Sequence, residues 1–243
     1  MFALYKKEIS AFLNTLIGYI IFLVFLLISS LFLWVFPTEF NILDYGYAQL
    51  DGFFMLAPIV FLFLIPAISM RLFSEEKKTG TLELLFTRPL NDWQIVGAKY
   101  LAALSLVAIV LLPSLIYVGT LYYYSFPTGN IDLGIICGSY LGLLLLAAVF
   151  SAIGIFSSAI TDNQIVAFLI SLFISAFFYQ GFEIIYSLDL FGNLDLLVQN
   201  LGIYSHYSSI RRGVVDIRDL VYFFSVIGLF LLFTHTILSR RKW

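Results

Sequence analysis

Six long runs without Asp, Glu, Lys or Arg divide the chain and constrain its fold more than any other feature. They are 19 to 32 residues long and cover positions 9–38, 52–70, 100–131, 133–161, 163–182 and 220–239. A bilayer core of about 30 Å is crossed by about 20 apolar residues in a helix that rises about 1.5 Å per residue. The sequence lacks the alternating segments of about ten residues that are typical of membrane β-barrels. The runs therefore predict six transmembrane helices.

The composition agrees with a protein that is embedded in a bilayer. Of the 243 residues, 61% are hydrophobic and only 12% are charged, whereas soluble domains carry roughly a quarter of charged residues. We expect an all-α integral membrane protein whose residues 1–243 form a single transmembrane domain in contact with a lipid bilayer. The predicted spans cover residues 16–36, 53–73, 95–121, 133–158, 163–184 and 220–238.

The distribution of basic residues predicts the orientation of these spans. When the chain is drawn with six spans, ten of its thirteen Lys and Arg residues fall on the side that holds both termini. Loops rich in Lys and Arg favour the cytoplasmic side of a membrane. We therefore expect both termini to be cytoplasmic.

Two segments outside the spans have amphipathic character. Apolar residues recur at helical spacing within residues 1–15, which predicts an interfacial helix on the cytoplasmic leaflet. This helix either anchors the chain only or also relays motion. Residues 185–219 form the one long outer segment and mix apolar stretches with charges. Short helices that re-enter the outer leaflet would satisfy their own backbone groups, so we expect such helices here.

A strip of small residues marks the beginning of the fourth predicted span. Gly134, Gly138 and Gly142 follow one another at intervals of four residues and lie on one face of a helix. Glycines in this spacing allow another helix to approach closely. Packing within the chain is the favoured use of this strip, and contact with a second copy is the alternative.

Motifs for catalysis or metal binding are missing from the sequence. It contains no Gly-x-x-x-x-Gly-Lys-[Ser/Thr] phosphate loop, no Gly-x-Ser-x-Gly elbow and no His-Glu-x-x-His pair. Its two histidines, His206 and His235, fall on opposite sides of the membrane, and Cys137 is its only cysteine. A metal site needs several such ligands close together. We expect no catalytic residue, no metal, no cofactor within this chain and no nucleic-acid partner.

A polar insert at residues 71–99 interrupts the apolar spans and is the clearest functional candidate. Its residues 74–94 are predicted to form a cytoplasmic segment, which we call the coupling segment. Within it, residues 81–87 can form two turns of amphipathic helix that begin after Gly80 and end before Pro89, because the residue before a proline avoids helix. An ordinary solvated loop that sets the topology is the alternative.

The apolar residues and the end of this insert add two expectations. Leu82, Leu85 and Phe86 are expected to offer an apolar knob to a partner. Asn91 and Gln94 have the spacing of a capping box, in which each side chain bonds the backbone at the other's position. The third span is therefore predicted to begin in the cytosol.

Residues 76–100 resemble the signature of the ABC-2 family of bacterial ABC-transporter permeases. They read Glu76-Lys-Lys-Thr-Gly-Thr-Leu-Glu-Leu-Leu-Phe-Thr-Arg-Pro-Leu-Asn-Asp-Trp-Gln-Ile-Val-Gly-Ala-Lys-Tyr100; in this family Glu, Gly-Thr, a following Pro and Gly-x-Lys recur. Residues 212–222 resemble the family's lead into its final span. Within the family, the chain is most similar to the gliding-motility-associated permeases of Bacteroidetes. Permeases of the transporter that matures the copper site of nitrous oxide reductase are a near alternative.

The resemblance implies a type V, exporter-like fold in the bacterial inner membrane. Two permease copies, or this chain and a related membrane subunit, would meet, and each would receive a separate ABC ATPase subunit that holds ATP and magnesium. The chain itself would not be an enzyme. The family motif implies that the ATPase-docking helix is formed by Glu76, Gly80, Thr81, Glu83, Leu85 and Pro89, with Lys77, Lys78 and Arg88 beside it.

The same resemblance implies a function in which ATP hydrolysis by the partner drives substrate export or mechanical transmission, in gliding motility. It also implies an auxiliary membrane-anchored subunit with an extracytoplasmic domain. The alternatives are copper-site maturation, a stand-alone carrier or channel, and a membrane scaffold that transports nothing.

Overall fold

The computed structural model describes residues 1–44, 49–87, 89–189, 192 and 195–240, and within these ranges the chain forms helices and no strands. One short 3₁₀ segment, η1, and one π-helical segment, η2, interrupt otherwise regular α-helices. In chain order the elements are α1 (Phe2–Leu13), α2 (Leu16–Trp34), α3 (Asp51–Ser69), α4 (Arg71–Lys78), α5 (Thr81–Phe86), α6 (Asp92–Leu111), η1 (Leu112–Ser114), α7 (Leu115–Tyr124), α8 (Leu133–Ile160), α9 (Gln164–Ala176), η2 (Phe177–Gly181), α10 (Phe182–Ser187), α11 (Asp195–Gln199), α12 (Ile203–Arg211) and α13 (Ile217–Ser239).

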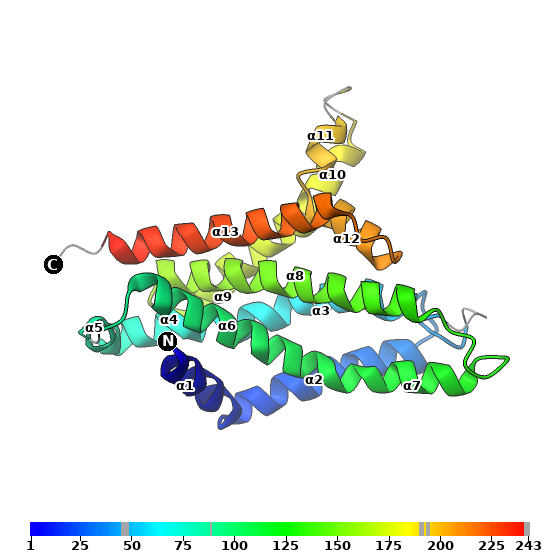
Figure 1. Ribbon diagram of the computed structural model, residues 1–243, viewed down its shortest axis with the longest axis horizontal. Coiled ribbons are helices and arrows are strands. Elements are labelled where there is room, and N and C mark those ends of the chain that lie inside the picture. Colours follow the sequence, from blue (N-terminus) through cyan, green and yellow to red (C-terminus); the bar gives the residue numbers. More distant parts are fainter. Residues whose placement is uncertain (45–48, 88, 190–191, 193–194, 241–243) are drawn as a thin grey trace.

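Six helical stretches of the described residues are long and apolar enough to cross a membrane, which confirms the predicted number. They run over Leu16–Trp34, Asp51–Lys78, Asp92–Tyr124, Leu133–Ile160, Gln164–Ser187 and Ile217–Ser239. Most of them follow the long axis of the molecule, and the start of α1 and the end of α13 lie with α5 toward the same end of it (Figure 1). The chain is thus an all-α membrane protein of six spans.

Helix α8 is the centre of the bundle. It packs against α3, α4, α6, α9, α12 and α13, and its inner half is lined by small residues that let these neighbours approach. A Cβ atom added at Gly154 would collide with Ser69 Oγ of α3. Helices α2, α9 and α13 instead turn large apolar side chains outward, as expected of lipid-facing spans; among them are Leu16, Leu23, Phe173 and Phe224.

The second span and the start of the coupling segment form nearly continuous helix. Helix α4 starts at Arg71, before the predicted boundary between residues 73 and 74, and only Met70 separates it from α3. Arg71 Nε donates to Glu75 Oε2 at 2.9 Å, one turn further on, and Lys77 and Lys78 occupy the last turn, where positive charge favours a helix. The charged sequence is therefore helical itself and extends the span into a rod.

Helix α10 ends the fifth span, and the described residues of the outer segment that follows form α11 and α12. Helix α12 lies on α8 where the glycine strip opens: a Cβ at Gly142 would lie 3.0 Å from Ile210 Cγ2, and one at Gly138 would lie 3.3 Å from Gly213 Cα. These two glycines therefore serve packing within the chain, the favoured use. The Tyr207 hydroxyl donates to the Phe54 carbonyl oxygen of α3 at 2.7 Å. Helices α10 and α11 project from the side of the bundle (Figure 1).

Candidate coupling site

The turn between α4 and α5 sets the direction of the coupling segment. At the end of α4, Thr79 N and Gly80 N donate to the carbonyl oxygens of Glu75 and Lys77 at 3.0 and 3.2 Å. Gly80 then adopts φ +71°, in the left-handed region, which costs a residue with a Cβ atom about 1–2 kcal/mol. The chain turns there, so that α5 lies crosswise to α4 (Figure 1).

Helix α5 has an inner and an outer face. Leu82 and Leu85 are buried on the inner face, in a cluster that includes Leu4 of α1, Phe73 of α4 and Ile95 of α6. Phe86 packs against the same cluster. The outer face carries Glu83 and Leu84, and 66% of the Leu84 surface is exposed.

This division differs from the predicted apolar knob. Leu82, Leu85 and Phe86 share one side of the helix because they are three or four residues apart, and α1, α4 and α6 cover that side. The exposed leucine is Leu84, which was not among the predicted site residues. Its spacing of three residues from Thr81 and Thr87, which are both exposed, is the sequence signal that could have identified it.

A cluster of four charges links the coupling segment to two other helices. The Lys99 side chain of α6 is fully buried, and its Nζ lies 3.0 Å from Glu8 Oε1 of α1 and 2.9 Å from Glu76 Oε2 of α4. Lys99 Nζ also donates to the Leu72 carbonyl oxygen at 2.5 Å. Lys7 Nζ of α1 donates to Glu76 Oε1 at 3.0 Å. We call Lys7, Glu8, Glu76 and Lys99 the charge cluster.

Charge balance explains how the cluster is tolerated near the protein interior. A buried ammonium group is costly unless opposite charges and hydrogen bonds compensate it, and two lysines face two glutamates here. For Lys7, burial on its own lowers the pKa, but the Glu76 and Glu8 carboxylates outweigh it and raise the pKa above its ordinary value. The cluster therefore acts as a charged link between α1, α4 and α6.

A second link joins α4 to the end of α8. Ser158 Oγ accepts from the backbone N–H groups of Phe73 and Ser74 at 2.9 and 3.0 Å and donates to the Met70 carbonyl oxygen at 2.9 Å. These groups lie at the start of α4, where backbone N–H groups lack partners within the helix. Lys77 Nζ donates to the Ala159 carbonyl oxygen. No motif in the sequence marks Ser158, because its partners are more than 80 residues away.

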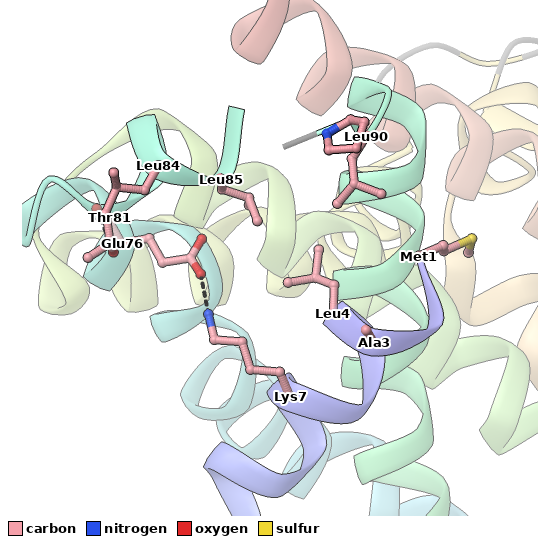
Figure 2. A pocket seen from close by; sticks show the side chains of 10 residues that line it. Met1, Ala3, Leu4, Lys7, Glu76, Thr81, Leu84, Leu85 and Leu90 are labelled. Atoms are coloured by element: carbon pink, nitrogen blue, oxygen red, sulfur yellow. Dashed lines mark hydrogen bonds and ion pairs between the residues drawn. The ribbon is translucent and has the colours of Figure 1, made fainter. Parts of the chain in front are cut away.

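Two hollows flank α5. A cavity of about 540 Å³ lies between α1 and α5, and Figure 2 shows Leu4 and Lys7 of α1 on one side and Thr81, Leu84 and Leu85 on the other. On the opposite side of α5, a groove of about 430 Å³ lies between α5 and the turn after α8. Its lining residues are Lys77, Gly80, Leu82, Glu83, Ile160, Thr161 and Asp162.

The described residues among those predicted to dock the ATPase differ in exposure and fall into three groups. Lys78, Gly80, Thr81, Glu83 and Pro89 are exposed. Glu76 and Leu85 point into the protein, toward the charge cluster and the inner face of α5. Lys77 is half-buried against the end of α8, and Arg88 lies outside the described residues.

The start of α6 is fixed by the predicted cap and by two contacts to α13. Asn91 and Gln94 form a capping box, in which Asn91 N donates to Gln94 Oε1 at 3.2 Å; this prediction is confirmed. The Trp93 ring stacks on the His235 ring, with 4.4 Å between the ring centroids. Ser239 Oγ donates to Asp92 Oδ2 at 3.2 Å. The coupling segment is thus held firmly at both ends.

The described residues contain no group of three or more His, Cys, Asp and Glu side chains placed to hold a metal ion. The site consists of an exposed helix face, two hollows beside it, and links to four membrane-spanning helices.

Comparison with known proteins identifies the family. Residues 37–199, more than half of the chain, match the family described as ABC-2 family transporter protein, and the match includes the whole coupling segment. No curated protein matches the chain. The match and the six apolar helices together make the chain a multi-pass membrane protein. The chain belongs to the ABC-2 family, whose members are the membrane-spanning permease subunits of ABC transporters and work with a separate ATPase subunit.

Proposed function

We propose that the coupling segment docks the ATPase and converts its closure into movement of the spans. The observation that carries this proposal is the two-faced packing of α5. Its inner face is anchored by Leu82 and Leu85, while Glu83 and Leu84 are exposed on its outer face. A helix anchored in this way transmits a push, because its inner side chains are close-packed and leave little room to yield.

The contacts behind α5 determine which helices would move with it. Helix α4 continues into α3, so α4 acts on the second span as a lever. Glu76 carries the displacement to α1 and α6 through the charge cluster, and Ser158 carries it to α8. In this proposal Glu76 and Leu85 support the docking surface from behind. The contact surface itself consists of Lys78, Gly80, Thr81, Glu83, Leu84 and Pro89.

The two hollows beside α5 suit a partner with apolar and acidic groups. The 540 Å³ cavity has mostly apolar walls next to Leu84 and can receive an apolar side chain of the ATPase. Lys78 is exposed at the rim of α5 and can pair with a carboxylate there. ATP and magnesium bind in the partner subunit, and this chain contributes no group to their chemistry.

The proposed contact with the ATPase also determines which side of the membrane the coupling segment must face. An ATPase that uses cytosolic ATP requires the coupling segment and both termini to be cytoplasmic, and the basic residues gathered at that end favour this arrangement. The membrane is the inner membrane of a bacterium. The functional assembly contains a second permease copy or a related membrane subunit, in a type V arrangement.

The biological process that we propose is gliding motility, with an auxiliary membrane-anchored subunit that carries an extracytoplasmic domain. Support for it is the similarity of the chain to permeases of that system, within the ABC-2 family that residues 76–100 and 212–222 resemble. Maturation of a copper site is the second candidate. The neighbouring reading frames distinguish them: gliding genes beside the ATPase gene support the first, and copper-site maturation genes support the second.

Co-purification tests the docking surface. The wild-type chain, purified in mild detergent from its own cells, should bring an ABC ATPase with it and stimulate its ATP hydrolysis. Combining Glu83→Arg with Leu84→Asp reverses one charge and places a carboxylate in the apolar contact, so we expect the ATPase to be lost by tenfold or more, in line with the roughly 2 kcal/mol of a strong interface residue.

The matched control is Glu39→Arg, which makes the same charge reversal at an exposed glutamate of another segment. It should retain the ATPase. If the Glu83 and Leu84 variant folds and still binds and stimulates the ATPase, the docking role of α5 is wrong. If wild-type protein moves a solute in vesicles without any ATPase, the chain is a stand-alone carrier.

A further inference from the structure

A small pocket lies on the outer half of the molecule, remote from the coupling segment. Its volume is about 160 Å³, and it opens between α3, η2 and α12. The rings of Tyr179, Tyr204 and Tyr207 form one wall, with 5.7 Å between the centroids of Tyr179 and Tyr204. Met55 and Ile59 of α3 form an apolar side and are themselves partly exposed. Tyr179 belongs to the π-helical turn η2; such turns occur frequently at functional sites.

One arginine lines this pocket without a protein partner for its charge. Within the described residues, the Arg211 guanidinium has no hydrogen bond and no ion pair; only its backbone oxygen is bonded, by Ser139 Oγ at 2.7 Å. Among the described residues that line the pocket, none is acidic. The pocket is therefore lined by a half-buried cation and, among its described residues, by no carboxylate.

The level of Arg211 along α8 indicates which anion can reach it. Ser139 is the seventh residue of α8, so Arg211 lies about 9 Å below the outer end of that helix. With 28 residues, α8 is about 42 Å long and exceeds a hydrocarbon core of about 30 Å by about 6 Å at each end. Arg211 consequently lies near the boundary between lipid headgroups and acyl chains.

We propose that this pocket binds one phospholipid of the outer leaflet, with Arg211 on the lipid phosphate and the α3 side chains on its acyl chain. Guanidinium groups bind phosphate oxygens through paired, charge-assisted hydrogen bonds. The hydroxyls of Tyr179 and Tyr204 add neutral donors, whereas the Tyr207 hydroxyl already donates to the Phe54 carbonyl oxygen. The exposed Met55 and Ile59 continue the site toward the bilayer, which favours a lipid over a free anion. This site is independent of the coupling role of α5.

Native mass spectrometry of the full-length, delipidated chain tests the proposal with two probes that share their acyl chains. Dioleoyl phosphatidylglycerol carries the phosphate, and dioleoylglycerol lacks it. We expect wild type to retain one phosphatidylglycerol molecule and to bind dioleoylglycerol at least about tenfold more weakly, the factor typical of a charge-assisted bond. Arg211→Gln should weaken phosphatidylglycerol binding by a similar factor, and Arg211→Lys should restore part of it.

The neighbouring arginine is the matched control. Arg212 is exposed, donates to the Ser208 carbonyl oxygen at 3.2 Å and lines a different cavity, so Arg212→Gln should leave binding within about twofold of wild type. Equal losses in the two variants, or equal binding of the two lipids, would overturn the proposal. Displacement of the lipid by millimolar inorganic phosphate would assign the pocket to a free anion instead. Tyr179→Phe, which removes only a hydroxyl, should weaken binding a few-fold and covers the case in which Arg211→Gln does not fold.

Discussion

The Lys99 ammonium group depends on two carboxylates, because its side chain is fully buried. Lys99→Met removes the cation and leaves Glu8 and Glu76 facing each other across a largely buried site. Removal of one partner of a buried ion pair typically costs about 3–5 kcal/mol. We therefore expect the free energy of unfolding in mixed micelles to fall by about that amount, with a matching fall in the thermal midpoint.

A double variant separates the charge from the packing. Lys99→Met combined with Glu76→Gln removes one charge of each sign and leaves Glu8 next to Lys7, 3.7 Å away. Replacing both partners of a buried pair costs much less than removing one, so this variant should recover more than half of the lost stability. A Lys99→Met protein as stable as wild type would show that the charge cluster contributes nothing to the joint between α1, α4 and α6.

At the scale of elements, the joint between α8 and α4 rests on one hydroxyl. Ser158→Ala leaves the backbone N–H groups of Phe73 and Ser74 without their acceptor, and a buried unsatisfied donor costs about 1–3 kcal/mol. We expect a loss of stability in this range, measured by unfolding in mixed micelles, and faster amide hydrogen exchange over α4.

The adjacent serine provides the control for this joint. Ser157 is equally buried, but its Oγ donates to the Ile153 carbonyl oxygen within its own helix. Because that carbonyl oxygen also accepts a backbone hydrogen bond within the helix, Ser157→Ala should change stability by less than about 0.5 kcal/mol. Similar effects of the two variants, or unchanged exchange over α4 in Ser158→Ala, would contradict the role of Ser158 at this joint.

Local patterns predicted some elements and not others. The capping box of Asn91 and Gln94 depends on a spacing of three residues, so the sequence contains all of its information. The inner face of α5 depends on α1, α4 and α6, which come together only in the fold. Six residues of helix are too few for periodicity alone to decide which side a neighbour will cover, so the sequence does not predict that Leu85 faces inward and Leu84 outward.

At the scale of the whole molecule, the number of spans could be predicted because each apolar run can be compared with the thickness of the bilayer on its own. The contacts between spans could not, since they join distant parts of the chain. Glu76 and Lys7 are 69 positions apart in the sequence, and Lys99 and Glu8 are 91 positions apart. A single sequence carries the charges of the cluster but not their pairing, and Glu76 was therefore assigned to the partner surface.

The orientation of the molecule can be tested with one cysteine at each end. The natural Cys137 is exposed on α8, so the background for this test is Cys137→Ala. Lys78→Cys lies beside the coupling segment, and Phe126→Cys lies at a turn between α7 and α8 where 96% of the side chain is exposed. A membrane-impermeant maleimide added to intact spheroplasts should label Phe126→Cys and should reach Lys78→Cys only after permeabilisation. The expectation rests on the basic residues gathered around α4 and both termini, which favour the cytoplasmic side. The reverse pattern would put α5 out of reach of a cytosolic ATPase and would exclude the coupling mechanism, whatever the strength of its internal links.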